Sequence, residues 1–276
     1  MSLSPANFEY VRTLLRQRSG QSLEDDKVYL VETRLLSLAR HHGFPTVEAL
    51  LSRWRDHAEE KLLDELVEAM TINETSFFRD GRPFEVLRQS VLPELIRRRS
   101  AVRRLNVWSA ACSSGQEPYS VAILLRHYFP TLSGWTVRLI ASDLSMTMLE
   151  RARHGRYSVL ETSRGLPPDL RDIYFHKKGN HWHIRDDLRH MVEFRPINLG
   201  NAWPHLPRLD LVLLRNVLIY FDIPIRQRIL DRLRHAMQPD GYLMLGGAET
   251  THNLDDRFLP ISFGQVSFFQ LRGATA

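Results

Sequence analysis

WSAACSSGQEPYS, residues 108–120, is the stretch of sequence that decides the fold. The strand-like run RRLNVWSA enters it, and the helix-like run PYSVAILLRHYF leaves it. Between the two runs, only Gly115 gives the backbone extra conformational freedom. A turn from a strand into a helix is the layout of a nucleotide-binding loop, where the ligand lies against the helix N-terminus. Glu117, however, puts a carboxylate where such loops hold a phosphate.

From Arg103 onward, apolar runs of strand length alternate with amphipathic helical runs. The candidate strands are LNVWSA, TVRLIAS, MVEFRPIN, LDLVLLRN and GYLMLGG. Helices are predicted near residues 118–129, 145–154 and 223–237. Strands so uniformly apolar suit a parallel sheet that is buried on both faces. The closing segment VSFFQLR is expected to return antiparallel at the edge of this sheet.

The segment at about 172–194 has a different pattern. A turn is predicted at Gly179-Asn180, and HWHIR alternates polar and apolar residues. The segment is therefore expected to be a small antiparallel β-hairpin inserted into the sheet domain. His181, His183 and His190 are read as residues of a solvent-facing hairpin in preference to a metal site.

Residues 1–72 read as a small all-α domain. Ser4-Pro5 opens the first helix, and Ser22 with Asp25 resembles a capping box for a second helix that stops near Gly43. Two more helices are expected between residues 46 and 70. Residues 73–102 then form a linker that leads into the sheet domain, residues 103–276.

Composition limits the class of protein. The chain has 276 residues, of which 43% are hydrophobic and 25% charged, which fits one large domain and one smaller one. No apolar run is long enough to span a membrane, and the N-terminus lacks the apolar core of a signal peptide. The single cysteine, Cys112, allows no internal disulfide and is typical of a reducing cytoplasm. We interpret it as a small buried side chain in preference to a nucleophile.

The net charge of +5 and the pI near 9.5 indicate an acidic partner: nucleic acid, a membrane surface or an acidic protein face. The basic residues are interleaved with acids, so a merely soluble and mildly basic surface also fits.

Residues that follow the strands decide the chemistry, because ligands of open parallel sheets lie beyond the carboxyl ends of the strands. The loop after the first strand lacks the spaced glycines of a pyrophosphate site and the lysine of a P-loop. Glu117 would repel phosphate and hold an ammonium group or favour a sulfonium; alternatively, it is a plain acid at a helix N-terminus. Asp143 either accepts hydrogen bonds from ribose hydroxyls or caps the following helix.

The third and fourth strands end in Asn198-Leu199 and Arg215-Asn216. An amide at Asn198 can read an adenine edge while Leu199 packs against the ring. Together with Glu117 and Asp143, these side chains describe a nucleoside that carries an amino-acid tail and no phosphate. S-adenosylmethionine is the common cofactor of that description.

Four motifs carry a resemblance to a known family: NETSFFRD at 73–80, WSAACSSGQEPYS at 108–120, ASD at 141–143 and RNVLIYFD at 215–222. They resemble the CheR family of chemotaxis receptor glutamate methyltransferases over nearly the whole chain. The resemblance implies an all-α N-terminal domain and an α/β, seven-stranded, Rossmann-like methyltransferase sheet with a small β-insertion. It also implies methyl transfer from S-adenosylmethionine to glutamate side chains on receptor cytoplasmic helices, leaving S-adenosylhomocysteine, with no metal.

The resemblance also implies the site residues. Arg79 and Tyr220 would lie near the transferred methyl and the substrate carboxylate. The cofactor contacts would be Asn73, Thr75, Arg79, Glu117, Asp143, Asn198, Leu199, Arg215 and Asn216.

The sequence departs from the family pattern in three places. Gln116 stands where many relatives have a second glutamate, which leaves Glu117 as the expected ligand. GGAE at 246–249 replaces an expected G-H-S-E, which removes a role for histidine there. The hairpin turn KKGN is short, so binding of a tethering peptide at a receptor C-terminus is not expected.

The expected partner is the cytoplasmic domain of a chemoreceptor, whose glutamate-rich helices match the positive charge. Basic N-terminal helices would form the docking face, with Arg12, Arg16, Arg34, Arg40, Arg53 and Arg55; solvated arginines are the alternative. A separate regulatory protein fits the sequence, and nucleic acid is not expected as a partner. The rival functions are a methyltransferase of nucleic acid or small molecules, and a non-catalytic cofactor-binding adaptor.

Overall fold

The computed structural model describes residues 3–57 and 59–273, which form two compact units. The helical unit comprises the N-terminal segment up to Ile72, together with Asn198–Ala202 and Ile219–Arg226. The sheet unit comprises Asn73–Ile197, Trp203–Leu218 and the chain from Gln227 onward. None of the helices described is both long and apolar enough to cross a membrane.

The helical unit is built on four α-helices and a short 3-10 turn. Their bounds are α1 Pro5–Ser19, the 3-10 turn Asp25–Lys27, α2 Val28–His41, α3 Val47–His57 and α4 Glu60–Met70. The first helix begins as predicted, because the Ser4 hydroxyl accepts the Asn7 N–H and Pro5 occupies the first turn. Buried apolar side chains from the four helices, including Val11, Leu35, Leu51 and Leu66, form its core.

The predicted capping box at Ser22 is wrong. Both the N–H and the hydroxyl of Ser22 donate to the carbonyl of Tyr220, at 2.8 and 3.2 Å. Because this hydroxyl is bonded to a distant segment of the same unit, it caps no helix. The second helix instead begins at Val28, after a 3-10 turn, without a side-chain cap.

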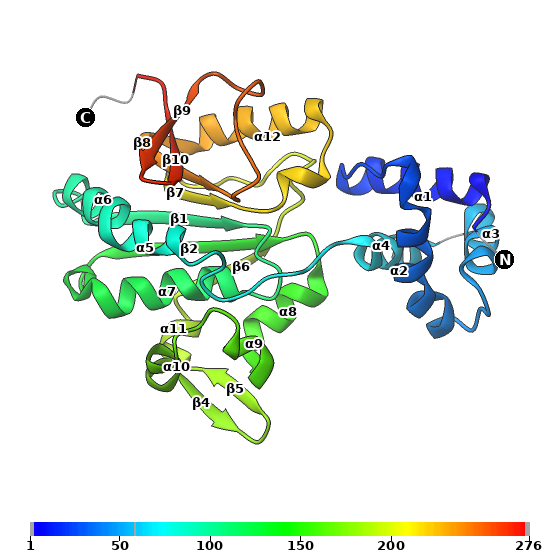
Figure 1. Ribbon diagram of the computed structural model, residues 1–276, viewed down its shortest axis with the longest axis horizontal. Helices are drawn as coiled ribbons and strands as arrows, with labels where there is room; N and C mark the ends of the chain where they lie inside the picture. Colours follow the sequence, from blue (N-terminus) through cyan, green and yellow to red (C-terminus); the bar gives the residue numbers. More distant parts are fainter. Residues whose placement is uncertain (1–2, 58, 274–276) are drawn as a thin grey trace. The chain divides into compact units, whose positions relative to one another are not determined.

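The sheet unit contains the seven-stranded α/β sheet that the family resemblance implies (Figure 1). The strand order is β6-β2-β1-β7-β8-β10-β9. The bounds are β1 Arg104–Ala110, β2 Thr136–Asp143, β6 Val192–Pro196, β7 Leu209–Leu214, β8 Met237–Leu245, β9 Phe258–Phe263 and β10 Val266–Leu271. The first five strands run parallel. The central strands β1 and β7 are buried nearly throughout, which explains their unbroken apolar sequence.

The C-terminal strand runs antiparallel to β8, as predicted, but it does not form the edge of the sheet. Residues 258–263 form β9, which pairs with β10 along its whole length and lies outside it. The sequence prediction missed β9 because only one of its residues, Phe258, is buried, and because it contains Pro260, which only an edge strand or bulge tolerates.

Two crossovers define where a ligand can bind. The helix α7 (Gln116–Tyr128) connects β1 to β2, and α12 (Ile223–Ala236) connects β7 to β8. Because β2 and β8 lie in opposite directions from the β1–β7 pair, right-handed crossovers put α7 and α12 on opposite faces of the sheet (Figure 1). The carboxyl ends of β1 and β7 therefore flank the switch point of the sheet, where open α/β sheets bind ligands.

The inserted subdomain has three strands, β3 Arg156–Ser158, β4 Phe175–Lys178 and β5 His181–Ile184, in the order β3-β5-β4. The predicted hairpin is β4–β5, with its turn at Gly179-Asn180. The three-residue β3 adds the third strand and was too short to give a sequence pattern. Four helices surround the insertion: α8 Met146–His154, α9 Val159–Ser163, α10 Pro168–Tyr174 and α11 Asp186–Arg189.

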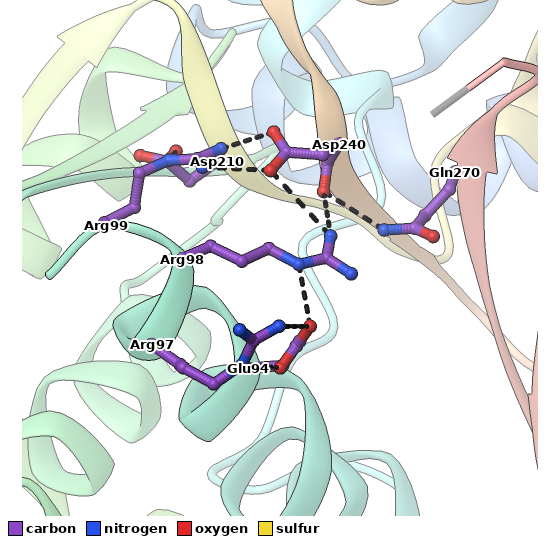
Figure 2. A network of polar contacts seen from close by, with 7 residues as sticks. All are labelled: Glu94, Arg97, Arg98, Arg99, Asp210, Asp240 and Gln270. Carbon is purple, nitrogen blue, oxygen red and sulfur yellow. Dashed lines mark hydrogen bonds and ion pairs between the residues drawn. The ribbon is translucent and has the colours of Figure 1, made fainter. Parts of the chain in front are cut away.

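A charged network fixes the linker helix to the opposite, amino end of the strands. The linker forms α5 (Arg82–Val86), a π-helical turn (Leu87–Val91) and α6 (Leu92–Arg98). Figure 2 shows Arg99 between two carboxylates of the sheet, Asp210 at the start of β7 and Asp240 in β8. Its Nε lies 2.6 Å from Asp210, whose other oxygen accepts the backbone N–H of Asn106. The network is therefore structural and lies apart from the switch point.

Candidate active site

The loop after β1 has a left-handed backbone that brings peptide groups toward the switch point. Ala111, Ser113 and Gly115 have φ values of 55°, 49° and 91°. Gly115 is required there, because a Cβ on it would lie 2.8 Å from the Cβ of Ala152. The glycine thus allows the start of α7 to pack directly on the end of α8.

Left-handed backbone recurs in the other predicted motifs. Of the seven non-glycine residues with positive φ in the described chain, five lie in these motifs: Phe78, Asp80, Ala111, Ser113 and Asn216. Each such residue costs about 1–3 kcal/mol and persists where the surroundings over-determine it, most often at a functional site. The three motifs therefore converge on one strained, well-supported region.

Asp143 ends β2 and organises the β1 loop. Its buried carboxylate accepts the backbone N–H of Ser113 at 2.7 Å and that of Ser145 at 2.9 Å. The cap of α8 is Ser145, whose hydroxyl accepts the Met148 N–H, so Asp143 is not the helix cap. A carboxylate oxygen has two acceptor positions, so Asp143 keeps capacity for hydroxyl donors.

Glu117 and Arg215 form a buried ion pair across the switch point. The guanidinium of Arg215, whose side chain is 1% exposed, lies 3.1 Å from Glu117 and 2.6 Å from Asp80. It also donates to the carbonyl of Arg79, and Ser109 donates to Glu117 at 2.8 Å. Two carboxylates thus surround one guanidinium, and the cluster keeps one net negative charge.

Two polar atoms of this region have no partner among the described residues. They are the Nε of Arg215 and the Oδ1 of Asn216, both buried. A buried polar atom without a partner costs about 1–3 kcal/mol. Atoms of this kind beside a strained loop indicate a place where a polar ligand binds.

Glu249 holds the turn after β7 in place. Its carboxylate accepts four backbone N–H groups, those of Asn216, Val217, Leu218 and Gly246, at 2.6–2.9 Å. Gly246 is required for this arrangement, since a Cβ there would lie 2.7 Å from Glu249 and 2.8 Å from the Asn216 amide. Glu249 therefore stabilises the left-handed turn at Asn216 that aims Arg215 at Glu117.

The segment 73–80 lies along the start of α7. The Ser113 hydroxyl donates to the carbonyl of Asn73 at 2.8 Å, and the Phe78 N–H donates to the Ser120 hydroxyl at 2.9 Å. Arg79 is half-buried and donates to the carbonyl of Glu74 at 3.1 Å, while Thr75 is half-buried nearby in the sequence.

Phe77 packs edge-on against two rings of the insertion and is fully buried. It therefore anchors the segment 73–80.

Three predicted site residues belong to the helical unit. The Asn198 amide donates to the carbonyl of Arg18 at 2.5 Å and accepts the Gly200 N–H at 2.9 Å. Leu199 is buried in the same unit, and the Tyr220 carbonyl binds Ser22. The other seven belong to the sheet unit, and direct contacts connect Asn73 and Asp143 through Ser113 and connect Arg79 and Glu117 through Arg215, next to Asn216; no such contact of Thr75 is seen among the described residues.

Cys112 and Gln116, two further residues of the loop motif, have structural roles. Burial, with the charges of Asp143 and Glu117, raises the pKa of the Cys112 thiol well above its usual value, so the thiol stays protonated. Gln116 is buried and accepts the hydroxyl of Ser114 at 2.9 Å.

Sequence reasoning missed two residues of this site, Asp80 and Glu249. Both stand inside quoted motifs, NETSFFRD and GGAE. The available signals were the position of Asp80 directly after Arg79 and the position of Glu249 three residues after Gly246, which follows a strand. A cavity of about 580 Å³ adjoins both residues. Its lining also includes Asp255 and Asp256, so it does not suit an anionic ligand.

Comparison with known proteins identifies the class. Residues 73–266 match the SAM-binding domain of CheR methyltransferases, and residues 6–71 match their all-alpha domain. The chain is 42% identical to chemotaxis protein methyltransferase 1 of Pseudomonas aeruginosa, over 94% of this chain and 95% of that protein. It is 39% identical to chemotaxis protein methyltransferase Cher2 of Pseudomonas putida, over 99% and 100% of the two chains.

A chemotaxis protein methyltransferase of Vibrio anguillarum is 35% identical over 94% of each chain. The fold and site thus define a methyltransferase with a SAM-binding domain. The chain belongs to the CheR methyltransferase family.

Proposed function

We propose that this protein transfers a methyl group from S-adenosylmethionine to glutamate side chains on the cytoplasmic helices of chemoreceptors, leaving methyl esters. The observation that carries the proposal is the ion-pair cluster at the switch point, in which the buried Arg215 pairs with the buried Glu117 and with the half-exposed Asp80. Dinucleotide sites bind a phosphate at this place, whereas the cluster presents a net negative charge there. The relatives' names, which say chemotaxis protein methyltransferase, support the choice of substrate.

The residues of the sheet unit fit S-adenosylmethionine. This cofactor has a sulfonium, an ammonium and a carboxylate, and so one net positive charge that complements the one net negative charge of the cluster. The unpartnered atoms of Arg215 and Asn216 suit its carboxylate and amino-acid tail. Asp143 keeps acceptor capacity for ribose hydroxyls.

Family resemblance adds further contacts to this proposal. On that basis Asn73, Thr75, Asn198 and Leu199 complete the binding set. When bound, the cofactor supplies an electrophilic methyl on sulfur, with S-adenosylhomocysteine as the product.

The chain need not supply a general base. A glutamate side chain has a pKa near 4.3 and is already ionised at neutral pH. The protein's task is therefore alignment of the nucleophile and exclusion of water, for which effective-molarity data allow about 7–11 kcal/mol. In this proposal Arg79 holds the substrate carboxylate in line, and Tyr220 orients the same oxygen.

The docking face is proposed to lie on the N-terminal helices. Arg40, Arg53 and Arg55 are exposed to solvent. Three further arginines of the predicted set make contacts within the helical unit: Arg12 pairs with Glu9 and Asp25, Arg16 with Asp222, and Arg34 donates to the carbonyl of Met70. Exposed arginines suit the acidic methylation region of a receptor. In this proposal the protein binds that region in the cytoplasm and does not need a tethering peptide at the receptor C-terminus.

Transfer of labelled methyl groups tests this function against its rivals. The protein is incubated with labelled cofactor and a panel of receptor cytoplasmic fragments, RNA, duplex DNA and a small-molecule extract. The proposal expects label in receptor protein that alkali releases as methanol. Label in nucleic acid or in small molecules would support the rival methyltransferases. Cofactor binding with no transfer to any substrate would support a non-catalytic adaptor.

A further inference from the structure

The inserted subdomain borders a second cavity, of about 430 Å³, that has no residue in common with the candidate active site. It lies in the sheet unit, where the end of α8, the hairpin β4–β5 and the start of α11 meet; Figure 1 shows these elements together. Its lining consists of Arg153, His154, His176, Lys178, His183, Ile184, Asp186 and Arg189. Cavities of roughly this volume are in the range that binds small molecules.

The lining carries a surplus of positive charge, from Arg153, Lys178 and Arg189 against one acid. Six of the eight residues are Arg, Lys or His, and Asp186 is the single acid. That acid is already neutralised, because Arg189 lies 2.9 Å from it. Within residues 3–57 and 59–273, no hydrogen bond or ion pair occupies the ammonium of Lys178. The cavity thus keeps a surplus of positive charge.

Two imidazoles lie against each other in this lining. His176 and His183 face each other across the hairpin and stack with ring centroids 5.7 Å apart. Burial and the charges of neighbouring cations lower the pKa of His183. The groups that act on this ring or share its cavity are His176, Lys178, Arg156, His181, Arg153, His154, Asp186 and Arg189.

We propose that this cavity binds the phosphate or diphosphate group of a small molecule. Such a group carries two or more negative charges and several acceptor oxygens in a compact volume. It can therefore pair with the Lys178 ammonium and accept hydrogen bonds from arginine and imidazole at the same time. A single carboxylate has too few oxygens and too little charge to match this lining. The proposal does not depend on the methyl-transfer function.

Two neighbouring lysines give a matched pair of variants. Lys178 lines the cavity, whereas Lys177 does not, because successive residues of a strand point to opposite faces. Both lysines are exposed, so neither substitution should disturb folding. Lys178→Gln removes one cation from the cavity. Lys177→Gln removes the same charge from the other face of the same strand.

Calorimetric titration of the full chain with inorganic pyrophosphate tests the proposal. We expect binding that Lys178→Gln weakens about tenfold, as the loss of one charge-assisted contact predicts, and that Lys177→Gln leaves unchanged. A parallel titration with ADP distinguishes a nucleotide, which would bind more tightly than pyrophosphate, from a free anion, which would not. Equal binding by the two variants would overturn the proposal.

The histidines provide a second readout. Sulfate keeps its charge between pH 6 and 8, so any pH dependence of its binding comes from the protein. We expect tighter binding at pH 6, and an upward shift of the His183 pKa in NMR when sulfate is added, because a bound anion stabilises the imidazolium. A glutamate-rich peptide is titrated in the same way. If it bound more tightly than pyrophosphate, and if Lys178→Gln weakened its binding as well, the ligand would be an acidic peptide and the phosphate proposal would be wrong.

Discussion

Arg215 sets the charge balance at the candidate active site. Its buried guanidinium has two carboxylate partners, Glu117 and Asp80, and holds the carbonyl of Arg79 as well. The planar fork of an arginine can serve several acceptors in fixed directions, whereas a lysine ammonium is a single point of charge. The geometry of this site thus depends on the shape of the side chain as much as on its charge.

Replacement of Arg215 by lysine separates these two contributions. We expect Arg215→Lys to stay folded but to bind S-adenosylmethionine at least tenfold more weakly, because the charge remains and the bridge between Glu117 and Asp80 is lost. Calorimetry measures the affinity, and Arg82→Lys, which changes an exposed arginine two residues after Asp80, is the control. Unchanged affinity in Arg215→Lys would remove the cluster from the cofactor site.

Arg79 is proposed to act on the substrate. Loss of its guanidinium in Arg79→Ala should lower kcat by one to two orders of magnitude, about 1.4–2.8 kcal/mol of transition-state stabilisation. Arg82→Ala, which removes a solvent-exposed arginine, should keep the wild-type rate. Initial rates at saturating receptor fragment measure the effect. A near-normal rate in Arg79→Ala would contradict the assignment.

Glu249 is a positioning residue, because it acts through the turn that carries Arg215 and Asn216. Glu249→Gln keeps the shape but brings amide hydrogens toward four N–H donors, so we expect a loss of about 2 kcal/mol in the free energy of unfolding. The KM for cofactor should rise more than kcat falls.

Asp256→Asn, an exposed acid of the same loop region, is the control for Glu249→Gln. Urea denaturation and initial-rate kinetics provide the two readouts. Equal effects of the two substitutions would contradict this role.

The acids and polar residues after strands were predictable from the sequence, since parallel strands bring their ends to one edge. The pairing of Glu117 with Arg215 was not predictable. It depends on the left-handed turn at Asn216, which a distant carboxylate, Glu249, holds in place. A sequence pattern contains no information on which of several acids reaches a given backbone turn.

At the scale of elements, α6 is fixed to the sheet by opposite charges (Figure 2). The hydrogen bond from Arg99 lowers the pKa of Asp240, whereas burial raises the pKa of Asp210. Asp240 therefore contributes stability above its unfolded pKa near 3.9, which is lost as the pH falls through its folded pKa. Asp210 acts in the opposite direction, because its raised pKa favours the folded state as the pH falls.

The substitution Arg99→Met tests the opposite pH dependences of Asp210 and Asp240. It leaves the buried Asp210 carboxylate without its cation, so we expect a loss of about 3–5 kcal/mol in the free energy of unfolding at pH 7.5. The loss in the free energy of unfolding should be smaller at pH 5, because protonation of Asp210 then removes the unpaired buried charge. Arg97→Met, which removes an exposed partner of Glu94, should change little. Urea denaturation at both pH values measures this, and a loss that grows toward pH 5 would contradict the sign.

Helices and strands with a clear hydrophobic pattern were predictable from the sequence. Strands that form only because they pair with another strand of the fold were not. The five parallel strands follow from largely apolar runs of strand length, and the helices between them from amphipathic runs. β9 and β3 are edge strands that each contain only one buried residue, Phe258 and Tyr157, so they give no apolar period and become strands by pairing with β10 and β5. The capping box at Ser22 failed for the same reason, since a distant carbonyl competed for its hydroxyl.

At the scale of the whole molecule, the net charge of +5 predicts electrostatic attraction to a glutamate-rich receptor. We expect kcat/KM for receptor fragments to fall as salt rises from about 0.05 to 0.5 M, while the affinity for cofactor changes little. The variant Arg40→Gln with Arg53→Gln should show a shallower salt dependence, because both arginines are exposed. A kcat/KM that salt does not change would exclude electrostatic docking.

The central claim is that the methyl acceptor is a receptor glutamate. The most direct measurement is mass spectrometry of a receptor cytoplasmic fragment after reaction, with the methylated residues mapped before and after mild alkali. The account predicts methyl esters on glutamate side chains that alkali removes as methanol, in amounts that Arg215→Lys sharply reduces. Alkali-stable methyl groups on other residues, or an unmodified receptor beside methylated RNA, would contradict it.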